Sequence, residues 1–144
     1  MNILGINHLG IAAKDPEKAR WFFTEILKLP FVGEELVLEQ KTQTLMFQSA
    51  NHSHENEARL ELLVNQAGEE GPIKKFIDTK GGGLHHLALT VENIELALTE
   101  LKAQGIELID QVPRGGAHNT RIAFVHPRAT GGILLELVQQ ASTH

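Results

Sequence analysis

Two histidines and two glutamates stand at matched positions in apolar stretches of this 144-residue chain. His8 and His86 lie in β-prone runs, and Glu61 and Glu136 each interrupt a run of leucine and valine. Positions 8 and 86 differ by 78, and positions 61 and 136 differ by 75. A carboxylate among apolar neighbours costs several kcal/mol unless its charge is compensated. Two imidazoles and two carboxylates together suit a divalent transition metal such as Zn, Co, Ni or Mn.

Each of these residues has an ordinary interpretation when it is taken singly. A strand glutamate is most often on the solvent face of a sheet, and a strand histidine is most often held by one hydrogen bond. The matched spacing of the four favours a metal site instead. Because successive strand side chains alternate faces, His85 and His86 cannot both point into that site. If His86 faces it, His85 faces away, toward a neighbouring element or a backbone carbonyl.

The elements that position these residues follow one pattern written twice. In the first copy, a β-prone stretch is followed by a helix that begins at Asp15 and Pro16, a good N-cap and first helical residue. In the second copy, the helix is capped by Asn93 and ends at Gly105. Further β-like segments follow each helix, at 32–39, 43–49 and 58–65, and at 106–109, 120–125 and 132–138.

The sequence therefore predicts an α+β fold of two tandem βαβββ modules in a single domain, 1–144. The first module spans about 1–66 and the second about 83–140. The connection, about 67–82, is rich in glycine and includes a predicted short helix from Pro72 to Thr79.

The composition excludes several classes of function. A net charge of −5 and a pI near 5.9 give no electrostatic reason to bind nucleic acid. The absence of cysteine excludes disulfides, thiolate zinc sites and thiol nucleophiles. The N-terminus lacks the pattern of a secretory leader, and no apolar run approaches the length of a membrane span. We expect a soluble cytoplasmic protein.

Nearly the whole chain resembles the vicinal oxygen chelate superfamily, and within it the methylmalonyl-CoA epimerases. NHLGIAAKDPEKARWFF fits many members, whereas GGGLHH and FVHPRATGGILLEL are more specific to the epimerases. The resemblance implies a mixed sheet that curls around a metal cleft, usually in a homodimer. It implies four metal ligands, His8, Glu61, His86 and Glu136, the same four residues that the repeat selects.

The implied activity is that of an isomerase acting on an acyl-CoA, which interconverts the two C2 epimers of methylmalonyl-CoA. A divalent metal stabilises the enolate formed when the C2 proton is removed. The resemblance assigns an acid–base role to Glu136. Some epimerases carry a second, non-ligand glutamate where this chain has Thr44, so the second proton-transfer group is open, and Glu61 is a candidate by pseudosymmetry. Arg114 is a candidate contact for a substrate carboxylate or phosphate, with a solvated turn arginine as the alternative.

Two other functions fit the same scaffold. A glyoxalase-I-like lactoylglutathione lyase would use the same ligands on a glutathione hemithioacetal, and the context of GGGLHH favours the epimerase over it. A non-catalytic small-molecule binding protein is the other alternative, and a complete set of four ligands argues against it.

His52 and His54 lie in a polar connection, where we expect them to be exposed.

Overall fold

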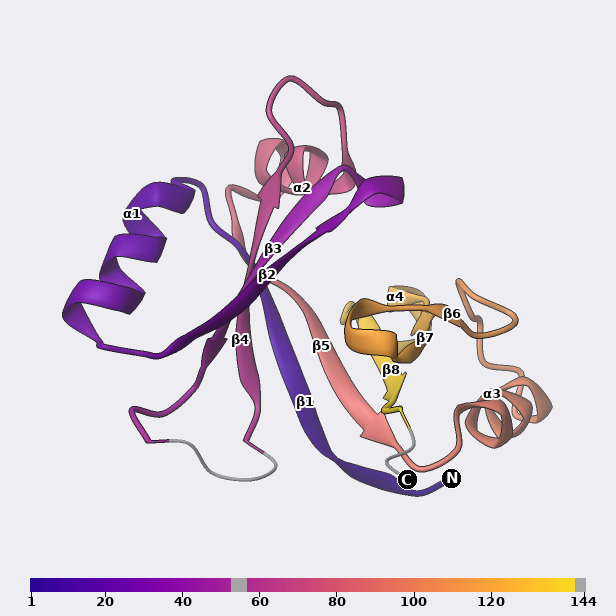
Figure 1. Ribbon diagram of the computed structural model, residues 1–144. Helices are drawn as coiled ribbons and strands as arrows, with labels where there is room; N and C mark the ends of the chain where they lie inside the picture. Colours follow the sequence, from indigo (N-terminus) through magenta and orange to yellow (C-terminus); the bar gives the residue numbers. More distant parts are fainter. Residues whose placement is uncertain (53–56, 142–144) are drawn as a thin grey trace. The chain divides into compact units, whose positions relative to one another are not determined.

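The computed structural model of the protein describes residues 1–52 and 57–141. These residues form two compact units (Figure 1). The first unit comprises His8–His85, and the second comprises Met1–Asn7 together with His86–His144. Strand β1 (Ile3–Ala12) contributes its start to the second unit and its end to the first, and β5 (Gly83–Val91) passes from the first to the second.

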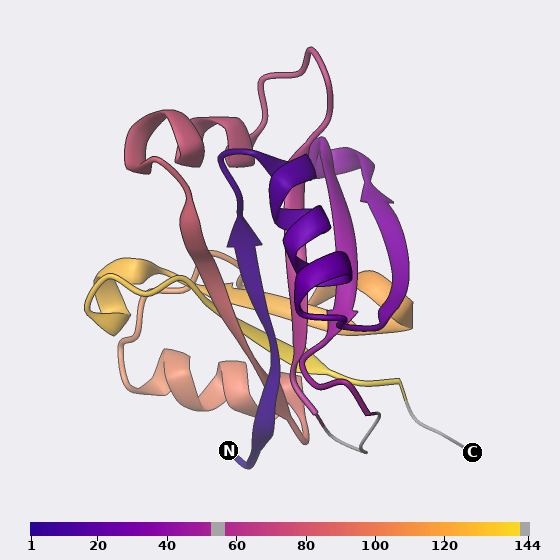
Figure 2. The ribbon, with the colours of Figure 1, turned by 90° about the vertical axis from the view of Figure 1, so that its left-hand side faces the viewer.

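The first unit is built on four strands in the order β2, β3, β4, β1. β2 and β3 are antiparallel, β3 and β4 are antiparallel, and β4 is parallel to β1. Figure 2 shows helix α1 in front of these strands. The elements after β1 are α1 (Pro16–Trp21), the π-helical turn η1 (Phe22–Ile26), β2 (Phe31–Val37), the short 3-10 helix η2 (Leu38–Gln40), β3 (Thr42–Gln48), β4 (Arg59–Asn65) and α2 (Pro72–Lys80).

Side chains cover both faces of this sheet. On one face, Leu45, Phe47 and Leu62 pack with Ala19 of α1 and Phe23 of η1. On the other face, Ala12 and Leu63 pack with Ile73 of α2. Because strand side chains alternate, residues at even positions of β1 and odd positions of β4 share this second face.

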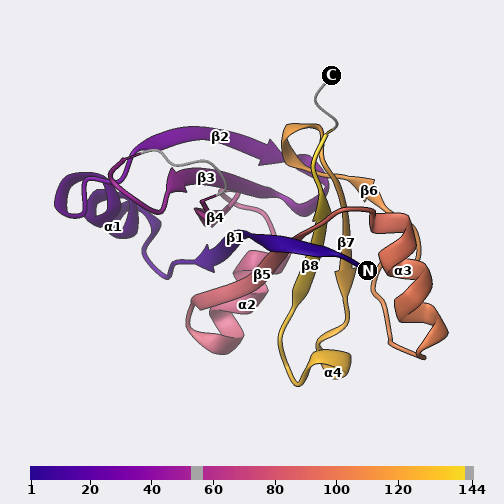
Figure 3. The same cartoon turned by 90° about the horizontal axis from the view of Figure 1, so that it is seen from below.

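The second unit repeats the arrangement. The start of β1 lies beside β5, followed by β8, β7 and β6. β5 is parallel to β8, and β7 is antiparallel to both β8 and β6. Figure 3 shows β7 and β8 side by side. After β5 come α3 (Ile94–Ala103), β6 (Arg114–Gly115), the 3-10 turn η3 (Ala117–Asn119), β7 (Arg121–Val125), α4 (Pro127–Thr130) and β8 (Leu135–Gln139).

The two predicted helix starts are confirmed. The Asp15 side chain accepts a hydrogen bond from the Lys18 amide at 3.1 Å, and the Asn93 side chain accepts one from the Leu96 amide at 3.0 Å. These bonds satisfy amides that have no partner inside the helix. Gly105 follows α3 with φ +73, a conformation that favours glycine and ends the helix. The predicted short helix in the connection is also present, as α2.

The predicted strand at 106–109 is wrong. Only Leu108 forms a β-bridge, with Val125, because the Asp110 side chain takes up the next position on the edge of β7. Its carboxylate accepts the Phe124 amide at 2.8 Å, a position that a strand carbonyl would otherwise fill. The edge is then completed by the two-residue strand β6, which the sequence analysis did not predict.

Two other strand boundaries differ from the predictions. β8 begins at Leu135 and not at 132, because Gly131 and Gly132 turn the chain at φ +80 and +104. β2 ends at Val37, and the rest of the predicted strand, 38–39, lies in η2. The division into modules at 1–66, 67–82 and 83–140 stays a prediction.

Candidate metal and substrate site

In the first unit, His8 and Glu61 form a buried pair. The parallel register of β1 and β4 places Glu61 opposite Gly10, two residues beyond His8, so both side chains lie on one face. His8 Nδ1 is 3.3 Å from Glu61 Oε2, and the two side chains are only 8% and 7% exposed. The pair therefore brings an imidazole nitrogen and a carboxylate oxygen to one point in a site largely removed from water.

Arg59 is a third member of this group and was not predicted from the sequence. Its Nη2 and Nε lie 3.1 and 3.3 Å from Glu61 Oε2, so the guanidinium donates two hydrogen bonds to the same oxygen that contacts His8. The spacing Arg59-x-Glu61 was the available signal, because residues two apart on a strand share a face. Arg59 supplies the positive charge that a buried carboxylate needs.

In the second unit, His86 and Glu136 form an equivalent buried pair. The register of β5 and β8 places Glu136 opposite Ala88, two residues beyond His86. His86 Nε2 is 3.1 Å from Glu136 Oε2, and both side chains are 8% exposed. Each of the two glutamates thus has a histidine partner in its own unit.

Arg114 lies on the same face of the second unit as Glu136. Phe124 is the cross-strand partner of Glu136, and its ring packs edge-on against His86 with centroids 5.8 Å apart. The Arg114 guanidinium stacks over the Phe124 ring at 5.5 Å. Its Nε is 3.3 Å from an Asp110 carboxylate oxygen, yet it is buried and makes no well-aligned hydrogen bond within the described residues. Arg114 is therefore partly buried beside the His86–Glu136 pair.

The remaining histidines behave largely as expected. The His85 ring packs edge-on against Phe76 of α2, with centroids 5.0 Å apart, so it faces a neighbouring element within the first unit. His52 is exposed, and His54 lies outside the described residues.

Thr44 is buried in β3, on the same face of the first unit as Glu61. It lies opposite Leu63, which is two residues beyond Glu61 in β4. On its other side, the cross-strand partner of Thr44 is Glu35 of β2. Nothing in the sequence around Glu35 indicates which face of β2 it occupies.

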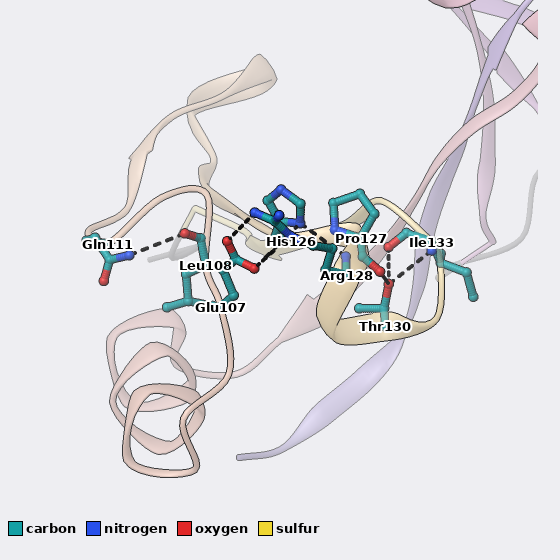
Figure 4. A network of polar contacts seen from close by, with 8 residues as sticks. All are labelled: Glu107, Leu108, Gln111, His126, Pro127, Arg128, Thr130 and Ile133. Carbon is teal, nitrogen blue, oxygen red and sulfur yellow. Dashed lines mark hydrogen bonds and ion pairs between the residues drawn. The ribbon is translucent and has the colours of Figure 1, made fainter.

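The segment that leads into β8 is anchored by an ion pair (Figure 4). Arg128 donates to both carboxylate oxygens of Glu107, with Nη2 at 2.8 Å and Nε at 3.2 Å. The hydrogen bond from Arg128 holds the pKa of Glu107 below its usual value of 4.5, against a smaller opposing effect of desolvation. The Thr130 hydroxyl donates to the Pro127 carbonyl at 3.1 Å and accepts the Ile133 amide at 3.0 Å. These contacts fix the turn from which Glu136 follows.

His126 caps α4 in the same network. Its Nδ1 accepts the Arg128 amide at 3.1 Å, which requires that this nitrogen carry no proton. The same nitrogen is 3.9 Å from a Glu107 oxygen, beyond hydrogen-bond distance. The shorter, directional bond to the amide identifies the structural role of His126 as a helix cap.

Among the residues that the structure describes, none of the helices is both long enough and apolar enough to cross a membrane.

Comparison with known proteins gives consistent relatives. The methylmalonyl-CoA epimerase of Bos taurus mitochondria is 34% identical over 139 residues, covering 96% of this chain and 75% of that protein. The crystal structure of methylmalonyl-CoA epimerase from Mycobacterium tuberculosis is similar with a TM-score of 0.85 and 31% identity, covering 97% of this chain and 90% of the other.

A variant of the Streptomyces coelicolor methylmalonyl-CoA epimerase, in complex with 2-nitronate-propionyl-CoA, is similar with a TM-score of 0.86 and 26% identity. The match covers 98% of this chain and all of the other, 100%. The family model of the glyoxalase/bleomycin resistance protein/dioxygenase superfamily matches residues 7–124. The chain therefore belongs to the glyoxalase/bleomycin resistance protein/dioxygenase superfamily, the vicinal oxygen chelate proteins.

Proposed function

We propose that this protein is an isomerase that interconverts the C2 epimers of methylmalonyl-CoA. The observation that carries the proposal is the buried His–Glu pair that each unit presents at the same register position, His8 with Glu61 and His86 with Glu136. The relatives named methylmalonyl-CoA epimerase support the substrate class, since they align over nearly the whole chain.

The four residues His8, Glu61, His86 and Glu136 are proposed to hold one divalent metal ion. Their donor set fits such an ion, because each pair offers one nitrogen and one oxygen within 3.1–3.3 Å of each other, in side chains that are more than nine-tenths buried. Two nitrogens and two oxygens, with no sulfur, suit Zn, Co, Ni or Mn. When bound, the cation supplies the Lewis acidity that stabilises negative charge on the thioester oxygen of the substrate.

Proton transfer at C2 is assigned to the protein's own carboxylates. The C2 proton of methylmalonyl-CoA lies between a thioester and a carboxylate, so its removal gives a delocalised enolate. Glu136 takes the proton on one face or returns it there. Inversion then requires a second group on the opposite face, for which Glu61 is one candidate. If Glu61 has that role, E61Q will hold metal but lose inversion; full turnover with metal retained would contradict it.

Substrate orientation is assigned to Arg114. Stacking on Phe124 limits the directions in which the guanidinium can point, and its Nε lacks a well-aligned partner among the described residues. A guanidinium is suited to the carboxylate or a phosphate of an acyl-CoA, because it can donate two parallel hydrogen bonds. R114Q is expected to raise KM more than it lowers kcat.

The experiment that tests the function is proton exchange in D2O. The metal-loaded protein is incubated with one epimer of methylmalonyl-CoA, with and without a chelator, and deuterium at C2 is followed together with the epimer ratio. Exchange with epimerisation that the chelator abolishes is the expected result. Absence of both in a metal-replete sample would reject the function, and turnover of the glutathione hemithioacetal of methylglyoxal would then point to the lyase.

A homodimer is the proposed assembly. Several large apolar side chains of the first unit are exposed, among them Trp21 and Ile26, each 51%. Exposed apolar area of this kind is typical of an interface. Light scattering should give twice the 15.9 kDa mass of one chain.

A further inference from the structure

Glu35 of β2 is a carboxylate without an evident structural role. It is partly buried, and its Oε2 is removed from solvent with no hydrogen-bond partner among the described residues. Burying a carboxylate oxygen without a partner is costly, and native proteins rarely do so without a reason. The neighbouring Glu34 behaves normally, since it is exposed and accepts a hydrogen bond from Gln43 at 2.9 Å.

A β-bulge determines the direction of Glu35. At the start of β2, Phe31 pairs with Phe47, but the register then shifts, and Gly33 pairs with Met46. In a regular strand, Glu35 would share the face of Phe31, four residues earlier, which is the face that α1 covers. The one-residue shift moves Glu35 to the opposite face. Gly33 permits this bulge with φ +148, which other residues rarely adopt.

The face that Glu35 joins is the one that carries the proposed ligands of the first unit. Glu35 lies opposite Thr44, Thr44 lies opposite Leu63, and Leu63 is two residues from Glu61 on the same strand. Directly opposite residues in antiparallel strands have side chains on the same face. Glu35 therefore places a carboxylate beside position 44, from the adjacent strand.

We infer that Glu35 is the second acid–base group of the proposed epimerisation, the group that inversion at C2 requires besides Glu136. The inference rests on the proposed function. Glu35 fits the role better than Glu61 does, because Glu61 Oε2 already contacts both Arg59 and His8, whereas Glu35 Oε2 accepts no hydrogen bond within the described residues.

Protons and electrons balance in this step. In one direction, the Glu136 carboxylate accepts the C2 proton, and the electron pair of the C–H bond delocalises onto the thioester oxygen. The protonated Glu35 carboxyl then gives its proton to the other face of C2, where the enolate electron pair forms the new C–H bond. Glu136 ends protonated and Glu35 ionised, and exchange with solvent resets both. In the reverse direction the two glutamates exchange roles.

The test compares E35Q with E34Q in the metal-loaded protein. Each epimer of methylmalonyl-CoA is supplied separately in D2O. In E35Q, we expect the epimer whose proton faces Glu136 to exchange it with retention, the other epimer not to exchange, and inversion to fall at least ~100-fold. E34Q changes the adjacent glutamate on the opposite face and should match the wild type.

Two further measurements separate a chemical role from a structural one. Metal content and the calorimetric Kd for 2-nitronate-propionyl-CoA, a planar analogue of the enolate, should be unchanged in E35Q. The double variant E35Q/T44E returns a carboxylate to the same face from the adjacent strand and should recover part of the inversion. If E35Q folds poorly, E35D retains the carboxylate one methylene further back and should show slower inversion with exchange intact on the Glu136 face.

The outcomes distinguish this inference from the function on which it rests. If the wild type inverts the substrate and E35Q inverts it equally fast, only the role of Glu35 is overturned. Equal loss of exchange from both epimers in a metal-replete E35Q also overturns it, because a group on one face cannot abolish exchange at the other. A metal-replete wild type that exchanges neither epimer overturns the proposed function itself, and the role of Glu35 with it.

Discussion

Glu61 and Glu136 hold the same register position in two different parallel strand pairs. Each lies opposite the residue that is two places beyond a histidine, Gly10 after His8 in one unit and Ala88 after His86 in the other. Residues two apart on a strand share a face, so this register places each histidine and the glutamate of its unit on the same face of the sheet. Each unit thus carries a buried histidine–glutamate pair, formed through His8 Nδ1 in one unit and His86 Nε2 in the other.

The adjacent histidines allow a matched test of metal binding. H86A removes a proposed ligand, and we expect it to weaken binding of a divalent metal by more than the roughly 10–100-fold that loss of an outer partner costs. H85A is the control, because His85 packs against Phe76. The metal affinity of the H85A protein should stay close to that of the wild type. Calorimetric titration of the metal-free proteins with Zn or Co measures both. Equal losses in the two variants would contradict the assignment.

The Arg59–Glu61 pair should stabilise the metal-free protein. R59Q leaves a buried carboxylate with its charge less compensated, so we expect the free energy of unfolding to fall by about 1–3 kcal/mol. R59Q/E61Q removes the charge as well and should recover most of that loss. Urea denaturation of the four proteins in this cycle gives the coupling energy.

An exposed ion pair provides the control for this cycle. Arg121 and Glu95 are 46% and 67% exposed, so R121Q should cost less than about 1 kcal/mol. A coupling energy between Arg59 and Glu61 that is no larger than the one measured at this exposed pair would show that burial adds nothing.

The Glu107–Arg128 pair predicts a specific acid sensitivity. The folded-state pKa of Glu107 lies below its usual value of 4.5, so the stability it contributes is complete above pH 4.5 and is lost as the pH falls through the lowered pKa. E107Q lacks a titrating group there. Its stability should therefore fall less steeply than that of the wild type below pH 4.5, as measured by urea unfolding between pH 7 and 3. Parallel curves would show that the pair makes no net contribution.

Local signals predicted the regular part of the fold well. Asp15 with Pro16 and Asn93 indicated both helix starts correctly, because capping depends on one side chain and the amides next to it. The repeat singled out one histidine and one glutamate in each module, and the structure pairs these two residues within each unit.

Features that depend on non-local partners were not predictable in this way. Residues 106–109 are apolar enough to suggest a strand. The Asp110 carboxylate, however, accepts the Phe124 amide to which a longer strand would bond. Arg59 and Glu35 look like ordinary surface charges in the sequence. Arg59 gains its role from the burial of Glu61, and Glu35 gains its position from a one-residue register shift that the alternation of letters does not reveal.

Gly33 is expected to determine both the stability of β2 and the face of the sheet on which Glu35 lies. A Cβ at this position would lie 3.7 Å from Met46 Cε, an ordinary contact, so the cost of G33A comes from the φ of +148 rather than from crowding. We expect the free energy of unfolding to fall by about 1–3 kcal/mol. If the strand relieves this strain by losing its bulge, Glu35 turns to the opposite face, and G33A should show the same one-sided exchange at C2 as E35Q.

G105A, at φ +73 after α3, is the control for strain alone: it should lose stability and keep inversion. A G33A protein that is destabilised to a similar extent and still inverts both epimers at the wild-type rate would show that the bulge does not direct a catalytic carboxylate.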